Sequence, residues 1–368
     1  MWVICVSQLT ASGGFPVGLP PAIQSPAAWL GPDLVASGGL IAHLTDSELR
    51  ELEATTAPWL ARAEVDPAAL NDLTPVNFPL LTLAPRLAAW RAELLEGRGF
   101  VLARGVPLQA WGRRFSAVAF FGLGVHLGRP RPQNAQGHLL GHVRDLGMSS
   151  DDPNVRVYQT AERQTYHTDS ADVVGLLCLQ TAKSGGLSAL VSSETVYNEM
   201  RRRRPDLAQL LCAPLAMDRR GEVPPGAKPY FEIPIFNWFA GKLSVFYQRQ
   251  YFDSAQRFPD APRLTPVHVE ALDLLDALTD DPTLHFTTAL EPGDLQFVHN
   301  HNLLHDRTAF ENWPEAERQR HLLRLWLAPE DARPLPLVFA LRYGSVVPGE
   351  RGGVAMPESG GIFPLPDA

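Results

Sequence analysis

Residues 165–169 read Thr-Tyr-His-Thr-Asp, and the rest of the chain can be interpreted around them. His167 and Asp169 are two residues apart, so on a strand both side chains lie on the same face. A neutral imidazole and a carboxylate aimed at one point supply two ligands of the 2-His-1-carboxylate triad that holds non-haem Fe(II). The best candidate for the third ligand is His305, which lies 305 − 167 = 138 residues later. A His-x-Asp pair is also common by chance, so a surface turn is the alternative for this pair alone.

The composition is that of an ordinary soluble globular chain of 368 residues, with 45% hydrophobic and 20% charged residues. Its net charge of −8 argues against a nucleic-acid partner, because phosphate binding needs clustered positive charge. Cys5, Cys178 and Cys212 are odd in number and far apart, so we expect neither a disulfide framework nor a cysteine metal site. No apolar run is long enough to span a bilayer. We therefore expect a cytoplasmic protein without a membrane partner.

Helical patterns dominate the first third of the chain. Thr45 and Glu48 form a capping box, and the helix that they open is expected to end near Thr55. A second helix is predicted over residues 85–95 and a third over residues 111–127, each from apolar side chains at helical spacing. The N-terminal half is thus more elaborate than a simple lead-in.

From residue 155 onward, short β-rich runs are separated by Gly, Pro and Asp. Together with an earlier buried run, the predicted strands are residues 99–105, 155–160, 173–179, 188–192, 230–236, 243–247, 284–287, 295–299 and 320–327. A helix opening at Thr265 is expected to pack on the outside of these strands. Many short strands with turns between them favour a sandwich or jelly roll, in an α+β protein.

Three histidines, His305 among them, and two arginines near the end of this region are candidate functional residues. His299, His301 and His305 share one strand phase, so the phase alone does not decide which of them joins a metal site. Arg320 and Arg324 fall on one face of the last predicted strand, where unpaired guanidinium groups would be costly. They either form structural salt bridges or bind the carboxylates of a dianionic small molecule, for which the guanidinium fork is suited.

These residues belong to an ordered set of motifs. The chain contains, in this order, His167-Thr168-Asp169, the Gly185-Gly186-Leu187-Ser188 turn, the Pro292-Gly293-Asp294 turn, Leu304-His305 and Arg320-x-x-x-Arg324. The set resembles the taurine dioxygenase (TauD/TfdA) family of Fe(II)- and 2-oxoglutarate-dependent oxygenases, over roughly residues 95–328. The resemblance implies a double-stranded β-helix, or jelly-roll, core with flanking helices and an elaborated N-terminal region.

The resemblance also implies roles for individual residues. His167, Asp169 and His305 would hold the iron. Arg320 would bind the distal carboxylate of 2-oxoglutarate, helped by Ser188, where the family more often has threonine. Arg324 matches a position near the other carboxylate of the cosubstrate. Asp169 favours hydroxylation over halogenation, because related halogenases lack this carboxylate.

The expected activity is oxidation of an unactivated C–H bond, with hydroxylation favoured, coupled to decarboxylation of 2-oxoglutarate to succinate and using O2. The substrate would be a small organic acid, an amino acid or a natural-product intermediate, and anionic. Its pocket is expected to draw on residues 133–145, 163–166 and the aromatic-rich stretch 219–238, with the anionic end held by Arg324 or Arg220. The alternatives are a non-catalytic metal- and ligand-binding jelly roll, and a zinc hydrolase on the same ligands.

The resemblance does not cover the N-terminal and C-terminal segments of the chain. We expect an N-terminal extension over residues 1–90, an oxygenase domain over residues 91–330 and a C-terminal tail over residues 331–368, all in one structural domain. The N-terminal extension would cover the mouth of the barrel or form a contact in a homo-oligomer.

Overall fold

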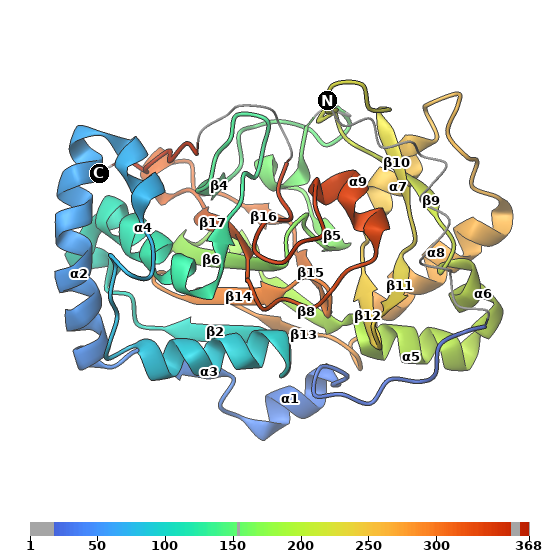
Figure 1. Ribbon diagram of the computed structural model, residues 1–368, viewed down its shortest axis with the longest axis horizontal. Coiled ribbons are helices and arrows are strands. Elements are labelled where there is room, and N and C mark those ends of the chain that lie inside the picture. Colours follow the sequence, from blue (N-terminus) through green and yellow to red (C-terminus); the bar gives the residue numbers. More distant parts are fainter. Residues whose placement is uncertain (1–17, 153–154, 355–360, 368) are drawn as a thin grey trace.

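The computed structural model describes residues 18–152, 155–354 and 361–367, and its centre is a pair of β-sheets (Figure 1). The larger sheet contains, in spatial order, β1 (Ile41–His43), β2 (Phe100–Arg104), β14 (Leu295–His299), β6 (Val173–Gln180), β17 (His321–Ala328) and β3 (Arg129–Pro130), with β4 (Gly141–Val143) also paired to β17. The smaller sheet contains β13 (Phe286–Thr288), β8 (Ser188–Ser192), β15 (Leu303–Arg307) and β5 (Gln164–His167). All strand pairs in the two sheets are antiparallel except β1 with β2.

The two sheets pack face to face through apolar side chains. One buried cluster joins Phe100 and Val298 of the larger sheet to Leu190, Phe286 and Leu303 of the smaller sheet. Alternation along each strand sends these residues inward and their neighbours outward. The α+β class and the jelly-roll core predicted from the sequence are confirmed.

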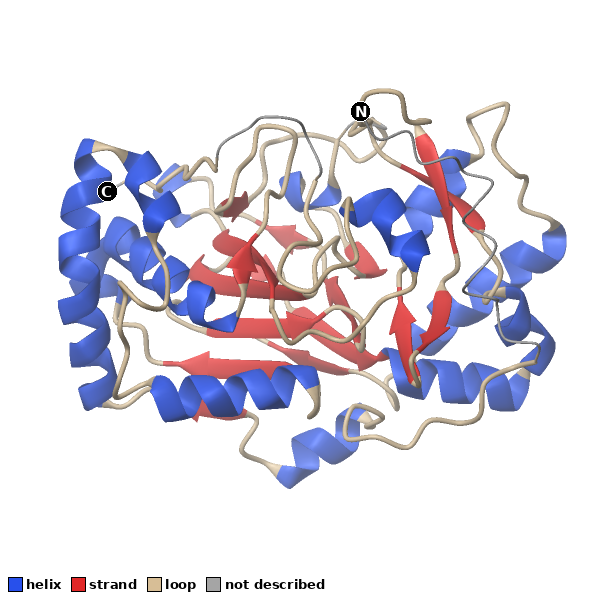
Figure 2. Cartoon of the chain, in the orientation of Figure 1, coloured by secondary structure: helices blue, strands red, loops and turns tan. Residues whose placement is uncertain are grey.

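Helices cover the outer face of the larger sheet (Figure 2). These are α2 (Asp46–Val65), α3 (Ala84–Leu95) and α4 (Leu108–Leu127). Contact is close, because a Cβ added to Gly124 of α4 would come within 2.5 Å of Leu325 of β17. The capping box of Thr45 and Glu48 is present at the start of α2.

Helix α2 does not end near Thr55, as the sequence suggested, but continues to Val65. Trp59 and Ala63 are both buried, and they extend the helical face that begins with Leu52. Burial of these side chains outweighs the hydrogen bond that Pro58 removes inside the helix.

A second group of elements covers the outer face of the smaller sheet. It consists of α5 (Ser193–Arg203), α6 (Pro205–Leu210), α7 (Arg249–Ala255), α8 (Pro266–Thr279), and the pairs β9 (Leu215–Asp218) with β10 (Tyr230–Ile233) and β11 (Phe236–Phe239) with β12 (Lys242–Val245). Helix α1 (Gly31–Ser37) instead lies at the edge strand β13, where Leu34 packs on the cluster between the two sheets. Leu272 and Leu275 of α8 share a core with Val191 of β8 and Leu304 of β15. The helix predicted after Thr265 therefore packs outside the sheets, as expected.

Residues 155–160 were predicted as a strand, and that prediction is wrong. They contain the short 3-10 helix Val157–Gln159, which Thr160 closes by donating from its backbone N–H and its hydroxyl to the carbonyl of Val157. The remaining short elements are β7 (Ser184–Gly185), β16 (Phe310–Glu311), α9 (Ala340–Tyr343) and the 3-10 helices Pro67–Asp72, Ala316–Arg318 and Leu337–Phe339. In the part of the chain that the structure describes, no helix combines the length and apolar character that crossing a membrane requires.

Candidate active site

The structure brings His167, Asp169 and His305 together. His167 ends β5 and lies opposite His305 of β15 in the sheet register, with 4.1 Å between the ring centroids. Asp169 follows two residues after the strand, and its Oδ2 is 4.0 Å from Nε2 of His305. One ligand atom from each residue lies within 4.8 Å of the others. This proximity allows the three side chains to converge on a single metal ion.

Local hydrogen bonds orient these side chains. Nδ1 of His167 lies 2.9 Å from the carbonyl oxygen of Thr165, which fixes the proton on Nδ1 and leaves the lone pair on Nε2, where the side-chain amide of Gln164 donates to it at 2.8 Å. Burial, together with the nearby His167, lowers the pKa of His305 to about 3, so this ring is neutral. Two neutral imidazoles can each offer a lone pair to a metal.

Asp169 is held as a carboxylate. Its Oδ2 accepts hydrogen bonds from Nε1 of Trp326 at 2.9 Å and from Nη1 of Arg324 at 3.2 Å. Burial alone would raise its pKa, but the charge of Arg324, the two histidines and the Trp326 hydrogen bond lower it to about 2. The backbone N–H of Asp169 donates to Asn300, which fixes the loop behind it.

Arg324 lies beside the triad. Its Nε donates to Oε1 of Gln133 at 2.7 Å, and its guanidinium group lies over the rings of Tyr158 and Trp326. Gln133 begins the stretch 133–145 that the sequence assigned to the pocket. Gln133 and Asp169 thus engage two of the five N–H groups of Arg324.

Arg320 is buried, and in the described chain its Nη1 has no hydrogen-bond partner. The guanidinium group lies 5.1 Å from the ring of Phe310. A Cβ added to Gly186, whose φ is +68°, would come within 2.8 Å of its Nε, so the glycine turn makes room for this side chain. Burial lowers the pKa of Arg320 to about 10, which leaves it charged near neutral pH.

Arg307 is a second buried arginine here, and the sequence reasoning did not select it. It lies on β15 two residues after His305, so both side chains are on the same face of the strand. Its guanidinium group is 4.8 Å from Phe310, and its Nε and Nη1 have no partner in the described residues. Burial and the charge of Arg320 lower its pKa to about 9. Ser188 lies opposite Arg307 in the register and donates to Gln296 at 2.9 Å.

His299 and His301 are fully buried but do not belong to the metal-binding group. His301 Nε2 is 2.7 Å from Oδ1 of Asp172, and Arg351 also donates to that carboxylate. A turn connects β14 of the larger sheet to β15 of the smaller sheet and separates these two histidines from His305. His301 supports the loop behind Asp169 through Asp172, whereas the ring nitrogens of His299 have no hydrogen-bond partner in the described residues.

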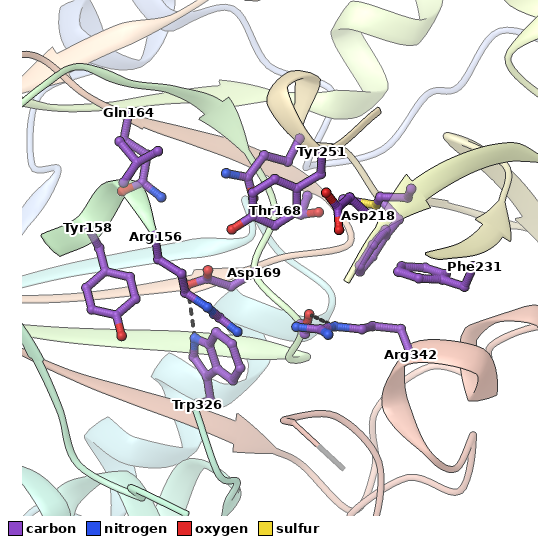
Figure 3. A pocket seen from close by; sticks show the side chains of 15 residues that line it. Arg156, Tyr158, Gln164, Thr168, Asp169, Asp218, Phe231, Tyr251, Trp326 and Arg342 are labelled. Carbon is purple, nitrogen blue, oxygen red and sulfur yellow. Dashed lines mark hydrogen bonds between the residues drawn. The ribbon is translucent and has the colours of Figure 1, made fainter. Parts of the chain in front are cut away.

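A narrow cavity lies against Asp169, with a free volume of about 20 Å³, or about 450 Å³ when the space open to solvent is included (Figure 3). Its lining residues are Arg156, Val157, Tyr158, Gln164, Thr168, Asp169, Ser170, Met217, Asp218, Phe231, Phe246, Gln248, Tyr251, Trp326 and Arg342. Of the aromatic-rich stretch 219–238, Phe231 reaches the cavity. Arg220 is not among the lining residues and donates to the carbonyls of Asp152 and Val155.

Comparison with known proteins matches this chain to one family model, "Taurine catabolism dioxygenase TauD, TfdA family", over residues 65–326. FR-33289 synthase of Streptomyces rubellomurinus is 35% identical over 263 residues, which are 70% of this chain and 77% of that protein. A uridine-5'-phosphate dioxygenase of an Amycolatopsis species is 30% identical over 175 residues, covering 45% of this chain and 62% of that protein.

Among solved structures, the fold is similar to that of an asparagine oxygenase determined with Fe(II), 3-hydroxyasparagine and succinate. The TM-score is 0.60, and the match covers 78% of this chain and 93% of the other at 18% identity. At this identity the likeness concerns the fold.

Proposed function

The chain belongs to the TauD/TfdA family of dioxygenases, and from that premise we propose that it hydroxylates an unactivated C–H bond of a small anionic molecule. The reaction would be coupled to decarboxylation of 2-oxoglutarate to succinate. As a member of this family, the protein is a non-haem iron enzyme that uses Fe(II), 2-oxoglutarate and O2. Its substrate, the coupling of the two half-reactions and the roles of individual residues are the proposed part.

The metal would be held by His167, Asp169 and His305. Their ligand atoms converge within 4.8 Å, and the carboxylate of Asp169 is ionised. Two imidazoles and one carboxylate on one side leave the opposite side open for other ligands. When bound, Fe(II) with 2-oxoglutarate and O2 supplies the oxidising chemistry. The protein's own part is to hold the ligands, orient the cosubstrate and place one C–H bond of the substrate.

The observation that carries the proposal is the buried, unpartnered cation of Arg320 inside the same barrel. A buried guanidinium group is costly without an anion, and the distal carboxylate of 2-oxoglutarate would provide one. Arg307, on the same strand face as the ligand His305, adds a second positive charge. Ser188 lies beside Arg307 and would contribute its hydroxyl.

Arg324 and Trp326 would act on Asp169 rather than on the substrate. Both donate to Oδ2, the oxygen that lies 4.0 Å from Nε2 of His305, and they would hold the carboxylate in place for the metal. Because Asp169 occupies a ligand position, a halide has no place there, and hydroxylation is the favoured outcome.

Iron binding and 2-oxoglutarate consumption test this function together. The purified protein is loaded with Fe(II), and bound iron and succinate formation are measured for the wild type and for Asp169→Ala. We expect Asp169→Ala to lose both, whereas Asp273→Ala, which removes a carboxylate exposed on α8, keeps both. Full activity in Asp169→Ala would contradict the triad. Iron binding without any 2-oxoglutarate turnover in the wild type would favour a non-catalytic binding protein.

A further inference from the structure

Two arginines from distant segments share one carboxylate beside the cavity. Arg156 precedes the 3-10 helix at Val157–Gln159, Arg342 lies on α9, and Glu222 lies between β9 and β10. Oε2 of Glu222 accepts from Nη2 of Arg342 at 2.9 Å and also pairs with Nη2 of Arg156. Side-chain exposures are 12% for Arg156, 8% for Arg342 and 9% for Glu222. These three residues form a buried cluster with two cations and one anion.

The cluster is part of the same cavity as the candidate metal ligand Asp169. Arg156 and Arg342 both line it, as Figure 3 shows. Nε of Arg342 donates to Oγ of Ser170 at 2.8 Å, and Ser170 is the residue after Asp169. A ligand bound to these guanidinium groups would therefore place its remaining atoms toward the metal position.

The charges around this part of the cavity do not balance. The lining carboxylates Asp169 and Asp218 already have their own arginines, Arg324 and Arg257, each at 3.2 Å. Glu222 is thus left to offset both members of the arginine pair. Buried charges need partners, so the pair retains one positive charge in excess.

A third arginine adds to this excess. Arg219 lies over the ring of the lining residue Phe231, and its Nε and Nη2 donate to the backbone carbonyls of Lys228 and Leu341, which carry no charge. Burial, with a contribution from the charge of Arg342, lowers the pKa of Arg219 to about 10, so it stays charged. Arg219 therefore adds positive charge on this side of the cavity.

We propose that Arg156 and Arg342 form the subsite for a phosphate-type dianionic group of the substrate. This inference rests on the proposed oxygenase function and names the substrate class for it. Two guanidinium groups suit the several acceptor oxygens of a phosphate group, and the excess of positive charge suits a dianion. The name of the uridine-5'-phosphate dioxygenase indicates that one relative acts on a molecule with such a group.

The apolar side chains of the cavity indicate where the rest of the substrate would bind. Met217, Phe231 and Phe246 line the wall. They would contact the carbon skeleton between the anionic group and the metal position. The oxidised carbon is then separated from the phosphate-type group, which the arginine pair fixes in place.

The probe for the test is methyl phosphate, a monoester that is close to doubly charged near neutral pH, compared with the monoanion acetate. Binding is measured by calorimetric titration of the enzyme loaded with Fe(II) and 2-oxoglutarate under anaerobic conditions. We expect the wild type to bind methyl phosphate at least tenfold more tightly than acetate. We expect Arg156→Met and Arg342→Met each to weaken methyl phosphate binding at least tenfold, with the affinity for 2-oxoglutarate changed by less than threefold. Arg129→Met, which removes a surface arginine paired with Glu330, should bind like the wild type.

A charge-neutralising control separates an anion receptor from a merely structural cluster. Glu222→Gln removes the anion that the two arginines share, so methyl phosphate affinity should rise at least threefold. Loss of affinity in Glu222→Gln, unchanged binding in both arginine variants, or equal affinity for acetate and methyl phosphate in the wild type would each overturn the proposal. The methyl phosphate titration is repeated without Fe(II) and 2-oxoglutarate, and 2-oxoglutarate is titrated separately into the Fe(II)-loaded enzyme. Failure of the proposed function would appear as a loss of 2-oxoglutarate binding, with methyl phosphate binding unchanged.

Discussion

Two buried arginines, Arg351 and Arg320, meet opposite conditions in the same fold. Arg351 is fully buried, and its Nε donates to both oxygens of Asp172 at 3.0 Å. Its Nη1 and Nη2 donate to the carbonyls of Val346 and Arg333. Arg320 is almost as buried, but in the described chain its Nη1 has no partner and no carboxylate pairs with it. The first arginine is satisfied within the fold, whereas the second is the one that we propose an anionic ligand satisfies.

The difference shows how structural and ligand-binding cations can be told apart. A buried ion pair that is fully hydrogen-bonded is disrupted at high cost when one partner is removed. A buried cation without a partner lowers the stability of the ligand-free protein, and an anionic ligand restores it. The two classes therefore predict changes of opposite sign when each arginine is replaced by methionine.

The largest effect is expected for Arg351→Met. The substitution leaves the buried carboxylate of Asp172 with only His301 beside it, so the free energy of unfolding should fall by about 3–5 kcal/mol. Urea denaturation at neutral pH measures the change. A loss below about 1 kcal/mol would mean that Arg351 is not the structural partner described above.

Arg320→Met should change the free energy of unfolding in the opposite direction. Removing an unpaired buried cation is expected to raise the stability of the ligand-free protein by at least about 1 kcal/mol. In the wild type, a hundredfold excess of 2-oxoglutarate over its Kd should add about 2.7 kcal/mol, and at the same concentration a variant that binds at least tenfold more weakly should gain about 1.4 kcal/mol or less. Thermal denaturation with and without 2-oxoglutarate reports both effects. A destabilised Arg320→Met that gains as much stability from 2-oxoglutarate as the wild type would remove the distinction between the two arginines.

A smaller effect is expected for Trp326→Phe, which keeps the ring and deletes one hydrogen bond to Asp169. Arg324 still holds the same oxygen, so the carboxylate stays ionised but is less well oriented. Outer-shell partners of this kind contribute about tenfold or more to metal affinity, and iron affinity should fall by about that factor. Competition with a chelator measures it, and an unchanged affinity would show that Trp326 does not position Asp169.

The smallest effect concerns a buried basic pair that stays neutral. Nδ1 of His142 and Nε2 of His321 are 2.8 Å apart. Burial and the neighbouring His142 lower the pKa of His321 to about 3, below its ordinary 6.5. Between pH 3 and pH 6.5 the His321 ring therefore binds more protons in the unfolded chain than in the folded protein. The stability that the neutral ring contributes is complete above pH 6.5 and falls as the pH drops, by about 1 kcal/mol per pH unit.

His321→Gln tests this pH dependence. Urea denaturation of the variant and the wild type, at neutral pH and one unit below 6.5, should show a smaller loss for the variant. An equal loss would mean that His321 is not the group that titrates.

Sequence reasoning could predict the arrangement of residues that lie close together in the sequence. His167 and Asp169 share a strand face by their spacing of two, and the resemblance to the family selected His305. His299 and His301 could not be separated from His305 by strand phase, because the turn between β14 and β15 interrupts that phase. Arg307 carried a signal that was available, since it follows His305 by two residues on one strand face.

Other features depend on contacts that no local pattern encodes. Arg156, Glu222 and Arg342 meet from segments far apart in the chain, so their shared carboxylate was not predictable. The true end of α2 depends on the burial of Trp59 against other elements. The division of the chain at residues 90 and 330 stays a prediction, although Arg342 and Arg351 of the C-terminal segment contact Ser170 and Asp172.

The most direct test of the central claim is an anaerobic titration of 2-oxoglutarate into the Fe(II)-loaded protein. Chelation of the keto acid to the iron is followed by its visible absorption band, for the wild type, Arg320→Met, Arg307→Met and the surface control Arg129→Met. We predict that the wild type and Arg129→Met saturate alike, whereas Arg320→Met needs at least tenfold more 2-oxoglutarate and Arg307→Met an intermediate amount. Saturation of Arg320→Met at the wild-type concentration, with iron bound, would contradict the assignment of the unpartnered arginine to the cosubstrate.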